Sequence, residues 1–124
     1  MADFVQWLRA QLDVDAARAI AAPRGPWSMD GSGSIVDADG GRVIPSVGGA
    51  LDGRSTRWPE GPVVDHVIAW DPAQVLRDIE GKRRIVDRYS WLREHGDTGG
   101  IAGVLQLLAL PYADRPGFRE EWRP

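Results

Sequence analysis

Two long segments of this chain place apolar residues three or four positions apart, which predicts amphipathic helices over 3–21 and 72–93. Asp71 directly precedes the second segment and can accept the free N–H groups of a first helical turn as an N-cap. Pro72 suits the first helical position because its missing N–H is not needed there. Gln74 stands where a capping box requires Glu or Gln. The second segment therefore carries the strongest start signal in the chain.

The outer face of that second helix is predicted to be charged. Opposite charges stand four positions apart in three pairs, each contributing about 0.2–0.5 kcal/mol on an exposed helix face: Asp78 with Lys82, Glu80 with Arg84, and Arg83 with Asp87. Gly81 weakens the middle of the helix by about 1 kcal/mol relative to alanine. The pattern favours a scaffold role for this helix.

The rest of the chain predicts smaller elements. Residues 101–110 are apolar almost all round and predict a short helix in the core, followed by a packed tail over 111–124. Turn clusters alternate with short β-branched pairs over 27–46, which predicts an antiparallel β-meander. Residues 47–62 show no period and are predicted to form a loop. The fold class predicted is α+β, with two main helices and a short third helix on the small sheet, in a single domain over 1–124.

Packing expectations follow from the same pattern. The inward side chains of the meander are predicted to be Trp27, Met29, Ile35 and Val43. Trp7 and Trp27 are predicted to be buried, and Trp122 to hold the tail against the body.

Composition narrows the functional classes. The chain has 124 residues, a net charge of −3 and no cysteine, which excludes disulfides, thiolate catalysis and cysteine-ligated zinc. No apolar run approaches the roughly 20 residues that a membrane span requires. We therefore expect a soluble cytoplasmic protein without a membrane contact, and no motif predicts a cofactor, a metal site or catalytic residues.

A binding site is predicted just before the long helix. Trp58 and Trp70 flank the least regular region, and His66 and Asp71 lie beside them in sequence. A helix N-terminus also favours anions there. Two histidines with aspartates could instead ligate a divalent cation, which makes a metal-dependent enzyme using His66 and Asp71 an alternative. No histidine spacing typical of a metal site supports that alternative.

A second candidate is the basic face of the long helix. Arg77, Arg84 and Arg88 recur at helical spacing near two aromatic side chains, which is the pattern of a weak nucleic-acid-binding surface. The acidic balance of the chain and the carboxylates four positions away weigh against this interpretation. A solvated helix face is the plainer explanation.

Two stretches carry a resemblance to a known family. They are the block Val67-Ile68-Ala69-Trp70-Asp71-Pro72-Ala73-Gln74-Val75-Leu76 and the ending Leu110-Pro111-Tyr112-Ala113-Asp114-Arg115-Pro116-Gly117-Phe118. Nearly the whole chain resembles a family of small actinobacterial and actinophage proteins, domain of unknown function 6221. The central block is also similar to phage Ead/Ea22-like proteins. Family members often carry histidine where this chain has Trp70, which weakens a metal role at that position. The resemblance implies a mobile-element setting and supplies no catalytic residues.

These observations favour a non-enzymatic protein that binds a host protein or a small ligand. The alternatives are weak nucleic-acid binding and a metal-dependent enzyme. A homodimer is also permitted, provided that the long helix leaves Val75, Ile79 and Val86 exposed.

Overall fold

The computed structural model describes residues 2–49, 56–58, 60–96 and 99–124, and describes the strand residues 47–49 and 56–58 by their backbone alone. Internal contacts divide the chain into two compact units, Met1–Ala16 with Asp78–Pro124, and Ala17–Arg77. Both boundaries fall inside helices, α1 (Ala2–Ala21) and α3 (Pro72–Glu94). The expectation of a single domain stays a prediction.

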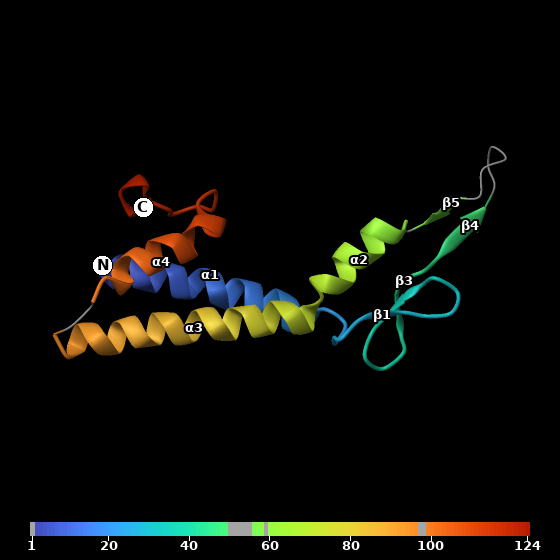
Figure 1. Ribbon diagram of the computed structural model, residues 1–124, viewed down its shortest axis with the longest axis horizontal. Coiled ribbons are helices and arrows are strands. Elements are labelled where there is room, and N and C mark those ends of the chain that lie inside the picture. The colour runs from blue at the N-terminus through green and yellow to red at the C-terminus, as the bar shows by residue number, and fades with distance from the viewer. Residues whose placement is uncertain (1, 50–55, 59, 97–98) are drawn as a thin grey trace. The chain divides into compact units, whose positions relative to one another are not determined.

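The first unit is helical. Its parts of α1 and α3 run antiparallel and side by side, and α4 (Ile101–Ala109) packs with them (Figure 1). Two short 3₁₀ turns follow, η1 (Leu110–Tyr112) and η2 (Glu120–Trp122). The largest fully buried side chains of this unit are Phe4, Leu8, Leu12, Ile79, Val86 and Leu105. The helical stripes predicted from the sequence thus form this core.

An aromatic cluster and polar contacts hold the tail of this unit. The rings of Phe4 and Trp122 have centroids 5.2 Å apart, and those of Trp7 and Trp122 are 5.5 Å apart. The Trp7 indole Nε1 donates a hydrogen bond of 3.0 Å to the Pro116 carbonyl. Gly117 has φ +87°, and a Cβ there would lie 2.8 Å from that Nε1. Glycine therefore suits this turn both by conformation and by space.

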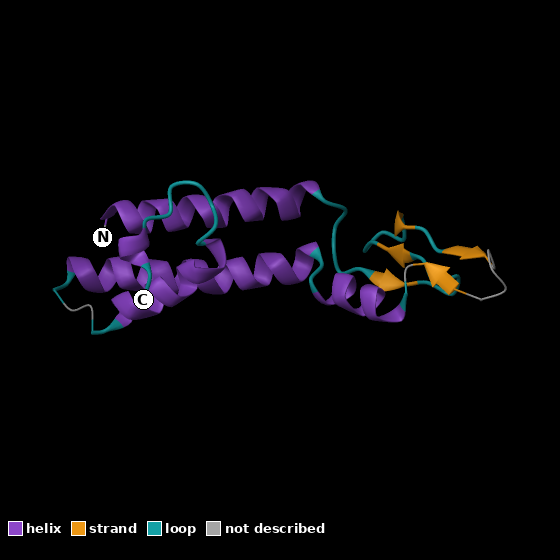
Figure 2. Cartoon of the chain, turned by 90° about the horizontal axis from the view of Figure 1, so that it is seen from above, coloured by secondary structure: helices purple, strands orange, loops and turns teal. Residues whose placement is uncertain are grey.

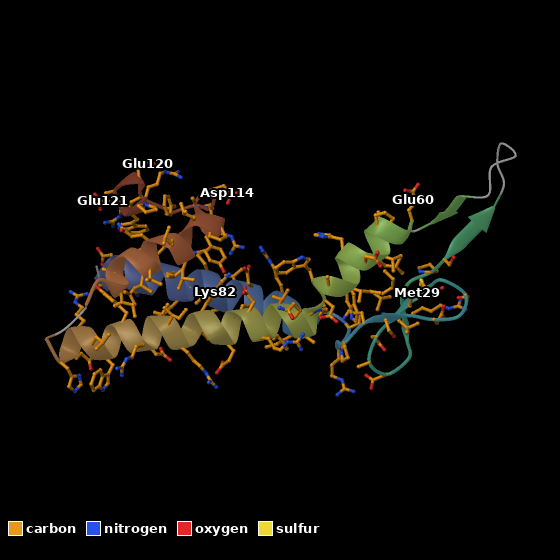
Figure 3. The ribbon with its side chains drawn as sticks, in the orientation of Figure 1. Met29, Glu60, Lys82, Asp114, Glu120 and Glu121 are labelled. Carbon is orange, nitrogen blue, oxygen red and sulfur yellow. The ribbon has the colours of Figure 1, made fainter. Side chains whose placement is uncertain are left out.

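Lys82 of α3 ties the helix to η1 (Figure 3). Its Nζ lies 2.8 Å from the Asp78 carboxylate and donates to the Tyr112 hydroxyl at 3.1 Å. Burial alone lowers the pKa of Lys82, but the hydrogen bonds with Asp78 and Tyr112 outweigh burial and raise the pKa above its ordinary value. Lys82 therefore stays charged where it is partly covered.

The second unit contains the strands that the structure describes (Figure 2). A three-stranded antiparallel sheet runs in the order β1 (Ser28–Met29), β2 (Ile35–Val36) and β3 (Arg42–Ile44). The register pairs Met29 with Ile35, and Ile35 with Ile44. This meander, together with the helices, confirms the predicted α+β class.

The prediction of a loop over 47–62 is wrong. Strands β4 (Val47–Gly49) and β5 (Thr56–Trp58) pair antiparallel, and α2 (Gly61–Ala69) begins at the end of that range. Strands of three residues are too short to show an alternating apolar–polar pattern. They form through hydrogen bonds between backbones, which leave no signal in the side chains. Pro62 lies in the first turn of α2, where proline is well accepted, so it marks a helix start.

The expected burial of the meander holds only in part. Ile35 is fully buried, whereas Met29 is 58% exposed (Figure 3). Trp27 and Val43 are half-buried, and Trp7 in the helical unit is half-buried as well. In strands of two or three residues, alternation alone does not decide which face is covered. The prediction that Met29 points inward is therefore wrong.

Candidate functional site

Asp71, predicted as a cap and as a site residue, serves the fold. It is 4% exposed, its Oδ1 accepts the Gln74 N–H at 2.8 Å, and its Oδ2 accepts the Trp27 N–H at 2.7 Å. The predicted N-cap is therefore present. The other half of the capping box is replaced, because the Asp71 N–H donates to the Ile68 carbonyl at 3.3 Å and Gln74 Oε1 accepts from Arg77. Both carboxylate oxygens are thus already engaged.

The other residues of that predicted site lie on different elements. His66 is exposed on α2, and Trp70 at the C-cap of α2 is 58% exposed. Trp58 lies in β5, and its side chain is outside what is described. No group of three His, Cys, Asp or Glu side chains placed to hold a metal ion occurs among the described residues. The metal alternative gains no geometric support.

The basic face of α3 is largely occupied by local contacts. Arg84 pairs with Glu80 at 2.9 Å, and the Arg88 guanidinium lies 4.8 Å from the centroid of the Trp91 ring. Trp91 in turn stacks on His95 with centroids 3.9 Å apart. Arg77 falls in the other compact unit. Of these cations, Arg84 is thus neutralised by Glu80, and Arg88 lies against the ring of Trp91.

The face predicted to support a homodimer is core. Ile79 is 2% exposed and Val86 is fully buried, because α4 and the tail complete a helical core around α3. Val75 is half-buried. The exposed apolar face that the homodimer prediction required is therefore absent from this part of α3. Association through another face stays untested.

An open groove lies between α1 and α3 of the helical unit, with a volume of about 700 Å³. We call it the α1–α3 groove. Its lining comprises Ala2, Val5, Gln6, Arg9, Ala10, Asp13, Tyr89, Ser90, Arg93 and Glu94. Alanine, valine and the tyrosine ring give it an apolar base, and longer polar side chains surround that base. Its volume falls within the roughly 300–1,000 Å³ of small-molecule sites.

Two ion pairs join α1 and α3 beside the groove. Arg9 donates to the Asp87 carboxylate at 2.6 Å and to the Ser90 hydroxyl at 3.2 Å. Arg83 donates to the Asp13 carboxylate at 2.7 Å. Sequence reasoning assigned Arg83 to Asp87 within α3, and that pairing is wrong. The charges bridge to α1 instead, because the antiparallel helices place each one beside an opposite charge.

Tyr89 contributes the deepest polar group of the groove lining. The residue is 3% exposed, and its hydroxyl forms no hydrogen bond within the described part of the chain. Every fully buried side-chain oxygen or nitrogen in that part has a hydrogen-bond partner. Because the Tyr89 hydroxyl has none, it must be accessible to solvent. The sequence analysis missed this position. The available signal was Tyr89 and Arg93 four positions apart, which places both on one helix face.

Arg93 and Glu94 are the lining charges that remain available. Arg9 and Asp13 are engaged in the ion pairs above, whereas neither Arg93 nor Glu94 takes part in an ion pair within the described ranges. Both lie in the last turn of α3 and are exposed. Chemically, the groove offers apolar surface, hydroxyl groups, one unengaged guanidinium and one unengaged carboxylate. No nucleophile–base pair of the kind that covalent catalysis requires lies among these lining residues.

The fold and groove define a class of small α+β protein with a surface groove between two helices. The chain belongs to the family of unknown function DUF6221, whose model matches residues 1–124. No curated protein and no solved structure matches it. No helix in the described ranges is long and apolar enough to cross a membrane.

Proposed function

We propose that this DUF6221 protein is a non-enzymatic binding protein whose α1–α3 groove takes a small amphipathic ligand. The observation that carries the proposal is the 700 Å³ volume over an apolar base, with polar side chains at its margin. Small-molecule sites have this composition, in which apolar surface supplies affinity and a few polar groups fix orientation. The cytoplasmic setting and the phage or mobile-element origin stay predictions.

The groove is supported by a rigid frame, which favours binding without a large rearrangement. Tyr89 packs in the core below it, and Arg9 is held by both Asp87 and Ser90. A preformed site loses less conformational freedom when a ligand binds, so more of the contact energy appears as affinity. These contacts support a small ligand over a host protein, which would need a wider surface of roughly 800 Å² per partner.

The two alternatives have weaker support. Weak nucleic-acid binding requires unengaged cations, but Arg84 is paired with Glu80 and the chain carries a net charge of −3. A metal-dependent enzyme using His66 and Asp71 requires Asp71 to leave two hydrogen bonds that hold the fold together. The groove therefore has better support as a binding site than either alternative.

A neutral probe tests the proposal independently of charge. We expect 1-octanol to bind with Kd near 1 mM, about −4 kcal/mol, and to shift the amide NMR signals of Val5, Tyr89 and Ser90. Val5→Trp places a large ring in the groove and should abolish these shifts. Val14→Trp is the matched control, because Val14 is an exposed valine of α1 outside the groove lining.

Both variants must first show a cooperative thermal transition like that of the unmodified chain. Octanol shifts that appear only on α4, where Leu107 is 58% exposed, would refute the groove as the site. Equal binding by Val5→Trp and Val14→Trp would refute it as well.

A further inference from the structure

On the α3 side, the α1–α3 groove is lined by one guanidinium, two hydroxyls and one carboxylate. Arg93 contributes a guanidinium, which has five N–H donors and no acceptor. The Tyr89 hydroxyl has no described partner. The Ser90 hydroxyl accepts from Arg9 at 3.2 Å, which leaves its own O–H available to donate. The exposed Glu94 carboxylate is the opposing charge at the margin.

Two of the three carboxylates near the groove are already paired, and Glu94 is the unengaged one beside Arg93. Asp87 is paired with Arg9 at 2.6 Å, and Asp13 is paired with Arg83 at 2.7 Å. Tyr89 and Arg93 are four positions apart on α3, so their side chains lie one above the other on the same helix face. An accessible hydroxyl and a guanidinium without an ion pair therefore share one helix face along the groove.

We infer that the ligand is an amphipathic small molecule with a single carboxylate, read by Arg93 and the Tyr89 hydroxyl while its apolar body lies on Ala2, Val5 and Ala10. Arginine pairs with carboxylates through two parallel N–H···O bonds, and its guanidinium is weakly hydrated, which suits a site with apolar surroundings. A second carboxylate would meet Glu94, so one negative charge fits better than two. This inference rests on the proposed function and adds the chemical class of the ligand.

Three probes with one apolar chain test the inference. Octanoate, 1-octanol and octylammonium share the chain and differ in charge, so their comparison isolates the head group. We expect octanoate to bind about tenfold more tightly than octanol, the combined effect of one exposed ion pair and one partly buried hydrogen bond. Octylammonium should bind no better than octanol. Isothermal titration calorimetry and amide shift titrations supply the dissociation constants.

Two variants assign the preference to residues. Arg93→Gln should reduce the preference for octanoate from about tenfold to about threefold, which is the contribution of the Tyr89 hydroxyl, and should leave octanol binding unchanged. Tyr89→Phe keeps the ring and should weaken octanoate about threefold, because it removes only the hydroxyl. Arg88→Gln is the matched control, an exposed arginine of α3 outside the groove lining, and should keep the tenfold preference.

The outcomes distinguish failure of the carboxylate preference from failure of groove binding itself. If octylammonium binds as tightly as octanoate, or if the full tenfold preference for octanoate survives Arg93→Gln, the carboxylate inference is wrong while groove binding by octanol still stands. If none of the three probes shifts the groove signals, the proposed function fails and the inference fails with it.

Discussion

Replacing Asp71 by alanine should destabilise the unit Ala17–Arg77 by about 2–4 kcal/mol. Loss of an N-cap side chain typically costs about 1 kcal/mol. The Trp27 N–H, which donates to Asp71 Oδ2 at 2.7 Å, would also lose its partner, and an unsatisfied buried donor costs about 1–3 kcal/mol. Because the residue is only 4% exposed, water replaces the lost carboxylate poorly.

Asp71→Asn separates the two hydrogen bonds. The amide oxygen can still accept one N–H, whereas the amide nitrogen cannot accept the other. We therefore expect roughly half of the loss seen with alanine. Asp65→Ala is the control, because Asp65 is an exposed aspartate of α2 in the same unit and should change stability by no more than about 0.5 kcal/mol.

Urea denaturation followed by tryptophan fluorescence measures these free energies of unfolding, with m-values checked for equality between variants. The amide NMR signals of Trp27 and Gln74 report the two bonds individually. A loss below about 0.5 kcal/mol for Asp71→Ala, or equal values for alanine and asparagine, would show that the two hydrogen bonds of the Asp71 carboxylate do not stabilise this unit.

Other changes have opposite expected signs. Gly81→Ala should stabilise α3 by about 0.5–1 kcal/mol, because a Cβ there meets nothing within 4 Å, and a drop in the urea midpoint would contradict this. Gly117→Ala should destabilise by about 1–2 kcal/mol, since φ is +87° and the Cβ would crowd Trp7; an unchanged midpoint would count against the tight turn. The pKa of Asp30 is lowered by hydrogen bonds from Ser32 and Ser34, so its contribution to stability is present above pH 3.8 and is lost as pH falls through the lower folded value. Ser32→Ala should return that pKa toward 3.8 in an NMR titration, and no change would refute the assigned cause.

Local signals in the sequence predict the helices well. Asp71 and Pro72 mark the start of α3, and the apolar stripes that include Leu8 and Val86 form the helical core. The prediction that α4 lies in the core holds only in part, because Leu105 is fully buried whereas Val104 is 41% and Leu107 58% exposed. These elements are predictable because helix caps and helical periodicity act over a few residues of one segment.

The groove was not predictable in the same way. It depends on which residues of α1 face which residues of α3, and no signal within one segment encodes that register. Arg83 illustrates the difficulty, because its partner is Asp13 on α1 although Asp87 stands at ideal spacing on its own helix. The strands β4 and β5 were missed for a different reason, because strands of three residues are too short to display an alternating pattern.

Gly25 approaches the first turn of α3 closely. A Cβ at this position would lie 2.8 Å from the Ala73 Cβ and 3.2 Å from Asp71 Oδ2. Larger side chains at 25 or 73 would push the Trp27 N–H away from the carboxylate that accepts it. A change at any one of three positions should consequently be tolerated poorly while the other two stay the same: Gly25, Asp71 and Ala73. We expect other DUF6221 sequences to retain all three together, while the groove residues diverge as lineages adapt to different ligands.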